Sequence, residues 1–310
     1  MKTRLSVPLL ALGFISVTAL SAAQTGYSIT VRAKDAPETR LRLAYHVGNM
    51  QYVRDSLVTD KGGTARFFGS ERLPAGVYMI VLPENIFFEF LVDDDQYFDI
   101  LFSKSDPAGT LTFTGSEENS RFVAYQRKWK QLQEEAMKIS TRLNSGQPGS
   151  AETTTARNEL SAQETRMKQF LRETAENNRG SLLGAIARSV IPVETPTPVV
   201  PPVTHNPDSV SRLLSYNSYK EHFFDNTDFS EPGLIRSPVL GNRLDQFFRQ
   251  VVIQMPDSII KEADRLLEMS SVNEDVFQYV AVWLMNKYAS SEIMGHDAVV
   301  VHLADRVYLA

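Results

Sequence analysis

The first third of the chain alternates apolar and polar residues with a period of two. The apolar positions of the clearest runs are Tyr27, Ile29, Val31, Ala33, Leu41, Leu43, Tyr45, Val47, Phe98, Ile100, Phe102, Leu111 and Phe113. This alternation predicts strands with one buried and one wet face. Turn-forming segments at residues 60–63, 74–76, 83–85 and 106–109 separate the runs. We therefore predict about seven strands in a small antiparallel β-sandwich over residues 24–116.

The period changes at residues 115–117. Apolar residues then follow at steps of three and four: Phe122, Tyr125, Trp129, Leu132, Ala136, Ile139 and Leu143. A weaker stripe at Leu160, Met167 and Leu171 follows a Gly/Pro break at residues 144–150. Two stripes around a short break favour an antiparallel helical hairpin over residues 117–191. A coiled-coil dimer is the alternative, but the second stripe is polar.

Residues 192–207 hold six of the fifteen prolines of the chain. Because proline fixes φ and lacks an N–H donor, this segment is expected to form neither a helix nor a central strand. We favour a semi-rigid linker. The alternative is a ligand for an aromatic-lined groove.

Residues 208–310 carry several helical stripes. The apolar positions expected to be buried are Leu240, Leu244, Phe247, Phe248, Val251 and Val252, then Ile259, Ile260, Ala263, Leu266 and Leu267, then Val272, Val276, Tyr279 and Trp283. Pro256 is expected to start a helix, and residues 299–309 would form the last one, which ends apolar and without a cap. The fold class is therefore α+β, a β-sandwich followed by a mostly helical region. The uncapped end leads us to expect that this last helix is cut short.

The N-terminus has the pattern of a cleavable secretory signal. Lys2 and Arg4 precede an apolar run over residues 7–20, and small residues at 21–23 place cleavage before Gln24. The run is shorter than the roughly 20 residues of a membrane-spanning helix. Because no cysteine follows the run, lipid attachment is not expected. We expect residues 1–23 to be a signal peptide and the mature protein to be periplasmic, not lipoprotein and not membrane-spanning.

Charge and composition exclude several functions. Removal of residues 1–23 leaves 30 basic and 37 acidic residues, a net charge of −7, which argues against nucleic-acid binding. The longest basic run, residues 127–130, is interpreted as the wet side of a helix. The chain has no cysteine, which excludes disulfides, thiolate metal sites and dithiol chemistry within it.

No catalytic, cofactor-binding or metal-ligating residue is assigned. Glu292, His296 and His302 lie close in sequence, but we favour helix-end polar contacts over a metal site. His222, beside two phenylalanines, is interpreted as a histidine at the edge of the core. Residues 93–95 lack the spacing of a calcium loop and are interpreted as a charged turn. A hydrolase that uses unassigned carboxylates stays open.

Two segments place aromatic residues on both faces of their strands: Phe67 with Phe68, and Phe87 with Phe88 and Phe90. Such residues could bind a sugar or a peptide. We favour the alternative, in which the helical part covers one of the two faces.

The helical region resembles a domain of unknown function found in exported proteins of Bacteroidota. The resemblance covers roughly residues 205–308. It rests on residues 219–229, Ser237-Pro238-Val239-Leu240, Pro256-Asp257-Ser258-Ile259-Ile260 with Ala263-Asp264, Asn286-Lys287-Tyr288, Ile293-Met294-Gly295, Asp297-Ala298 and His302-Leu303-Ala304. The phrase Leu73-Pro74-Ala75-Gly76-Val77-Tyr78 resembles the small β domain that often precedes that domain.

In that family a thioredoxin-like domain of the TlpA or AhpC/TSA type, with a Cys-x-x-Cys pair, commonly follows. This sequence has no position onto which those cysteines can be carried. The resemblance therefore implies an accessory part. We expect a non-catalytic exported binding or scaffolding module with an unknown envelope partner or ligand. The alternative is a portion of a periplasmic thiol–disulfide oxidoreductase whose catalytic domain lies beyond residue 310.

Overall fold

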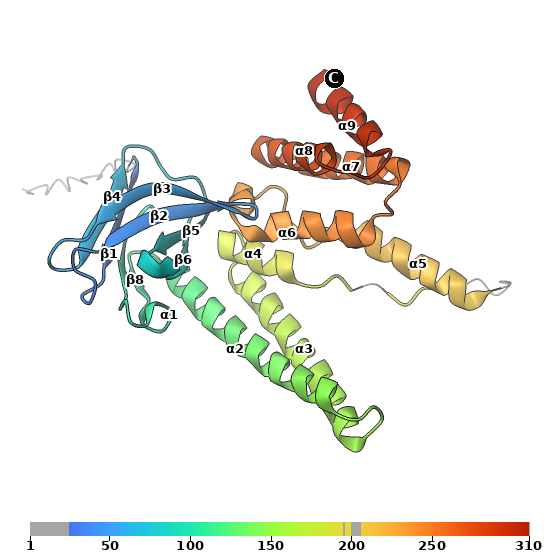
Figure 1. The fold of residues 1–310 in the computed structure, drawn as a ribbon, viewed down its shortest axis with the longest axis horizontal. Coiled ribbons are helices and arrows are strands. Elements are labelled where there is room, and N and C mark those ends of the chain that lie inside the picture. The colour runs from blue at the N-terminus through green and yellow to red at the C-terminus, as the bar shows by residue number, and fades with distance from the viewer. Residues whose placement is uncertain (1–24, 195, 200–205, 310) are drawn as a thin grey trace, which may run out of the picture.

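A computed structural model describes residues 25–194, 196–199 and 206–309. The expected signal peptide, part of the Pro-rich linker and the last residue lie outside the described residues. The α+β class is confirmed, with two sheets followed by a helical region (Figure 1). The strands are β1 (Tyr27–Arg32), β2 (Arg40–Val47), β3 (Met50–Val58), β4 (Thr64–Gly69), β5 (Gly76–Val81), β6 (Phe87–Val92), β7 (Tyr97–Leu101) and β8 (Thr112–Thr114).

The strands form two four-stranded sheets, with the orders β4-β1-β7-β8 and β3-β2-β5-β6. All the pairs are antiparallel except β1 with β7, which run parallel. The purely antiparallel expectation was therefore wrong for that pair, because a pattern of period two is the same in both directions. The short η1 (Pro83–Asn85) and α1 (Pro107–Thr110) lie in the connections.

Two helices, α2 (Glu117–Ser145) and α3 (Ala151–Asn177), form a hairpin that projects away from the sandwich (Figure 1). Ser116 and Ser150 accept hydrogen bonds from the first turns of these helices, which fixes where each begins. Between the helices, buried Gln163 donates to the carbonyl of Leu132 at 3.0 Å. A third helix, α4 (Leu182–Val190), follows α3 and is almost entirely buried.

The helical region begins at a proline, as do several of its helices. Its elements are α5 (Pro207–His222), η2 (Pro232–Arg236), α6 (Pro238–Gln246), the π-helical η3 (Phe247–Val251), α7 (Pro256–Ser270), α8 (Glu274–Ala289), α9 (His296–Ala304) and the π-helical η4 (Asp305–Leu309). Proline suits the first helical position, where its missing N–H has no intrahelical partner.

The buried face of α8 differs from the expected one. Val276, Val280, Leu284 and Tyr288 are buried, whereas Val272 is 67% exposed. Asn273 caps the helix, so Val272 precedes it and the true stripe runs at steps of four.

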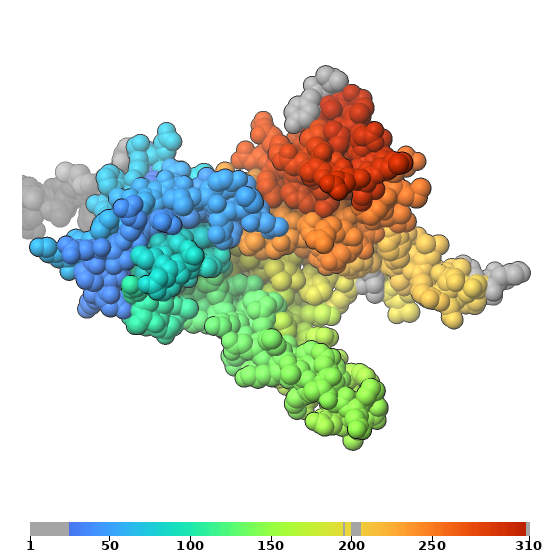
Figure 2. Space-filling model, in the orientation of Figure 1, coloured from blue at the N-terminus to red at the C-terminus, as the bar shows by residue number. Residues whose placement is uncertain are grey.

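The sandwich and the helical region share a core. Val77 of β5 and Leu91 of β6 are buried in the same cluster as Phe122, Leu182 and Ile235. The tip of the β2–β3 hairpin also reaches the helices, since the amide of Gly48 donates to the carbonyl of Ile235 at 2.8 Å. Figure 2 shows the sandwich in direct contact with the helical part. The outer face of sheet β3-β2-β5-β6 is therefore partly covered by helices.

Candidate binding surface

Two loops meet at one end of the helical region. The first, residues 252–255, joins η3 to α7, and the second, residues 290–295, joins α8 to α9. They abut, because a Cβ placed on Gly295 would lie 3.2 Å from Cγ of Pro256. Gly295 has φ of 89°, a conformation that glycine adopts without steric cost.

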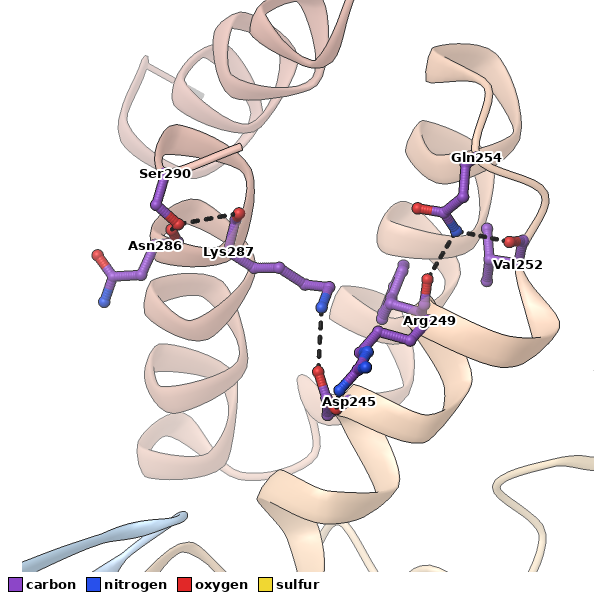
Figure 3. Close-up of polar contacts among 8 residues, drawn as sticks. Asp245, Arg249, Val252, Gln254, Asn286, Lys287 and Ser290 are labelled. Carbon is purple, nitrogen blue, oxygen red and sulfur yellow. Dashed lines mark hydrogen bonds and ion pairs between the residues drawn. The ribbon is translucent and has the colours of Figure 1, made fainter. Parts of the chain in front are cut away.

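Hydrogen bonds hold the first loop. The side-chain amide of Gln254 donates to the carbonyls of Phe248 and Val252, both at 2.7 Å (Figure 3). The amide of Met255 donates to the carbonyl of Ile253 at 2.8 Å. These bonds take up carbonyl groups at the end of the π-helical turn, so the loop is fixed to η3.

The second loop is held in the same way. The hydroxyl of Ser290 donates to the carbonyl of Asn286 at 2.8 Å (Figure 3). Ser291 Oγ lies 2.8 Å from His296 Nδ1 and accepts from the amide of Ile293. The first loop is thus bonded to η3, and the second loop is bonded to both α8 and α9.

Four large apolar side chains of these loops face solvent. Ile253 is 54% exposed, Met255 61%, Ile293 54% and Met294 96%. We call them the Met/Ile patch. Neighbouring large apolar residues that remain exposed are typical of a contact surface, and methionine adapts to varied partners.

Buried aromatic rings lie close to both loops in sequence. The ring of Tyr288 lies 6.1 Å from that of Phe248 and 5.3 Å from that of His296. Burial raises the pKa of the Tyr288 hydroxyl. Within the described residues, neither this hydroxyl nor Nε2 of His296 has a hydrogen-bond partner.

An ion-paired group flanks this region. Asp245 lies 3.1 Å from Nζ of Lys287 and 3.1 Å from a guanidinium nitrogen of Arg249 (Figure 3). Burial alone would raise the pKa of Asp245, but the hydrogen bonds from the two cations outweigh it and lower the pKa. The ammonium of Lys287 also lies over the ring of Trp283, at 5.1 Å. The ion pair of Asp245 with Lys287 links α6 to α8, and the pair with Arg249 links α6 to η3, so Asp245 connects the elements from which the two loops start.

Three carboxylates lie within or near the two loops in sequence. Glu292 lies within the second loop, Asp257 and Asp297 lie in the first turns of the helices that follow the two loops, and all three are exposed. Exposed carboxylates therefore lie close in sequence to the apolar side chains of both loops.

The structure separates the histidines considered as metal ligands. His296 bonds Ser291, and Nε2 of His302 lies 2.8 Å from Asp264 on α7. No cluster of His, Cys, Asp and Glu in metal-binding geometry occurs among residues 25–194, 196–199 and 206–309. His296 makes its contact at the start of α9, whereas the contact of His302 joins α9 to the middle of α7.

One interpretation was wrong, and one pair was missed. His222 is exposed, and its Nδ1 lies 2.8 Å from the carboxylate of Asp225. Phe223 and Phe224 are buried in the core, but His222 is not buried with them. His46 was assigned no role, yet it is buried on the outer face of β2, with Nε2 2.9 Å from Glu89. Only the pairing of β2 with β5 and of β5 with β6 brings these two residues together.

The aromatic strand positions divide between core and surface. Phe67, Phe88 and Phe90 are buried in the sandwich, but Phe68 is 70% and Phe87 51% exposed. The helical part covers the outer face of β6 at Leu91 but leaves these two rings uncovered. The expected covering is therefore wrong for Phe68 and Phe87.

No protein-family model and no curated protein matches the chain. Within the described part of the chain, none of the helices combines the length and apolar character that crossing a membrane requires.

Proposed function

We propose that this chain is an exported, non-catalytic binding or scaffolding module of the bacterial periplasm, and that it binds through the Met/Ile patch. The sequence pattern of residues 1–23, which is typical of a secretory signal, supports export. The patch carries the binding proposal, because four large apolar side chains are held in solvent by loops with their own hydrogen bonds.

The chemistry of the patch indicates the kind of partner. An apolar surface with Asp257, Glu292 and Asp297 close to it in sequence suits a protein with an apolar contact surrounded by lysine or arginine. Burial of a methionine or isoleucine side chain contributes about 1.5–3 kcal/mol. Two such residues suffice to dominate an interface of modest affinity.

Photo-crosslinking in the producing cells tests this proposal. A benzophenone amino acid replaces Met294 in one variant and Met137 in another, since Met137 is also exposed, at 73%, but lies on the hairpin. We expect one dominant crosslinked protein from position 294, lost when Ile293→Glu is added, and none from position 137. Equal crosslinking from both positions, or from neither, would contradict binding at the patch.

A second proposal rests on the resemblance to exported Bacteroidota proteins. In it, the chain is the accessory portion of a periplasmic thiol–disulfide oxidoreductase, and the patch contacts the thioredoxin-like domain. The intact mass of the native protein tests this. A mass larger by about 100–150 residues supports the second proposal, whereas the mass of residues 24–310 contradicts it.

A further inference from the structure

A second candidate binding surface, separate from the Met/Ile patch, lies along the edge of β6 that pairs with no other described strand. β6 is the last strand of its sheet, and Asn119 of α2 binds its outer edge at Leu91. Oδ1 of Asn119 accepts from the amide of Leu91 at 2.7 Å, and Nδ2 donates to its carbonyl at 2.8 Å. One side chain thus satisfies the two groups that a further strand would bind.

The same edge stays open at the other end of β6. Backbone groups of alternate residues point to the same edge, so the N–H and C=O groups of Glu89 and Phe87 face outward together with those of Leu91. Within the described residues, no loop hydrogen bond reaches the backbone of either residue from this side. Side chains of α2 lie opposite this part of the strand, since Gln126 Nε2 is 3.5 Å from Glu89 Oε2, but no described side chain of α2 bonds the backbone of Phe87 or Glu89. Two outward-facing peptide groups are left beside a gap.

The gap is a cleft of about 220 Å³. Its apolar lining comes from Phe87, Phe88, Leu111 and Val123, and its polar lining from Glu89, Gln126, Arg127 and Lys130. At about 30 Å³ for each water, the space corresponds to roughly seven waters. It therefore has room for one large apolar side chain and its adjoining backbone.

The walls of the cleft are fixed. Arg127 donates to the carbonyls of Ala108, Gly109 and Leu111, so its guanidinium braces α1 against α2. Glu89 is held by His46 at 2.9 Å. Lys130 keeps a positive charge at the cleft, 4.0 Å from Glu134 and with its side chain 75% exposed. Within the basic run at residues 127–130, Arg127 is therefore occupied by internal hydrogen bonds, whereas the exposed Lys130 can pair with a bound ligand.

We infer that this cleft binds an extended peptide segment of another protein, which adds as a short strand to the edge of β6. Its backbone pairs with Glu89 and Phe87, one leucine- or phenylalanine-sized side chain enters the cleft, and a neighbouring carboxylate meets Lys130. Strand addition supplies affinity through main-chain hydrogen bonds and specificity through the pocket for alternate side chains. The site uses the β-sandwich and not the Met/Ile patch, so it goes beyond the function proposed above.

Synthetic peptides test the inference directly. The probe is the fluorescent hexapeptide Thr-Val-Leu-Val-Asp-Thr, compared with a version methylated at alternate backbone nitrogens and with one that carries alanine for leucine. The mature protein is titrated with each peptide by fluorescence anisotropy. We expect the parent peptide to bind at least tenfold more tightly than either altered peptide.

Two variants and one control complete the test. Ala108 is exposed on α1 and lines the cleft, so Ala108→Trp should fill it and weaken binding at least tenfold. Lys130→Glu should weaken binding about fivefold through charge reversal. Lys128→Glu makes the same change on the same helix outside the cleft and should leave binding unchanged.

Amide hydrogen exchange supplies a structural readout. Exchange at Phe87 and Glu89 should slow when the parent peptide binds, while exchange at Phe68, on the edge strand β4, should stay the same. No binding of the parent peptide, equal binding of the methylated peptide, or equal weakening by Lys128→Glu and Lys130→Glu would overturn the inference.

Discussion

Asp93 lies where the sandwich, the hairpin and the helical region meet. It follows β6 in sequence and accepts a hydrogen bond from the amide of Leu182 at the start of α4. Burial, together with the carboxylates of Glu118, Glu231 and Asp94, raises the pKa of Asp93 from its ordinary 3.8 to about 6. Its charged form is therefore disfavoured in the folded protein, and we predict that Asp93→Asn stabilises the protein at neutral pH.

The direction follows from proton linkage. Because the folded pKa lies above the unfolded one, the folded state binds more protons between pH 4 and pH 6, and the stability falls as pH rises through that window. The difference between 3.8 and about 6 would correspond to about 3 kcal/mol for a fully buried group. Asp93 is only half-buried and partly screened by solvent, so we expect about 1–2 kcal/mol.

A second carboxyl group near Asp93 also has a raised pKa. Burial also raises the pKa of Glu231, although its carboxylate accepts from the amide of Gly233. Arg72 lies nearby but donates to the backbone carbonyls of Asp93 and Asp94, and its guanidinium is 3.9 Å from the carboxylate of Asp94. The neighbourhood of Asp93 is therefore mainly negative.

Urea unfolding at pH 4.5 and pH 7.5 measures the effect. The wild type should lose stability between the two values, and Asp93→Asn should abolish most of the loss, since asparagine still accepts the hydrogen bond of Leu182. Asp94→Asn is the matched control: this carboxylate lies in the same turn but is fully exposed, so the pH dependence should largely remain. A wild type more stable at pH 7.5, or an Asp93→Asn variant that keeps the full pH dependence, would refute the reasoning.

Three further substitutions test the packing by urea unfolding. Leu91→Ala removes a side chain buried in the core that the sandwich and helices share, so we expect a loss of 2–5 kcal/mol in a single transition; two separate transitions would contradict a shared core. Gly48→Ala places a Cβ 2.2 Å from Oη of Tyr279, at a residue whose φ is 53°. We expect this substitution to cost about 1–3 kcal/mol, and the additional substitution Tyr279→Phe should recover part of the lost stability. Glu262→Gln removes the charge of a carboxylate side chain that is 95% buried and pairs with Lys220 and Arg265. Because the side chains of these two cations are 24% and 31% exposed and partly hydrated, we expect a cost of about 1–2 kcal/mol, and a neutral effect would contradict a stabilising role of these ion pairs.

The spacing of apolar residues correctly predicted the elements whose buried side chains recur at a regular interval. The helix starting at Pro256 and the buried face from Leu240 to Val252 are where the sequence placed them. The parallel pairing of β1 with β7 was not predictable, because it depends on contacts between segments about 70 residues apart. A single capping residue, Asn273, was enough to shift the stripe of α8.

The candidate surface depends on features that a residue pattern does not encode. The sequence Ile293-Met294-Gly295 is apolar, and an apolar triplet is more often buried than exposed. Its exposure follows from the contact of Gly295 with Pro256, which brings two loops about 40 residues apart together. The edge of β6 was hidden for the same reason, since only the sheet order makes it an edge.

The most direct test of binding at the Met/Ile patch is the affinity of the protein crosslinked at Met294 for purified variants of residues 24–310. Titration calorimetry compares the wild type, Ile293→Glu with Met294→Glu, and the exposed control Met137→Glu. Binding through the Met/Ile patch predicts that the double variant loses affinity at least tenfold, and about a hundredfold if both apolar side chains are buried at the contact, with no change in the control. Equal affinity for all three proteins would contradict binding through the Met/Ile patch.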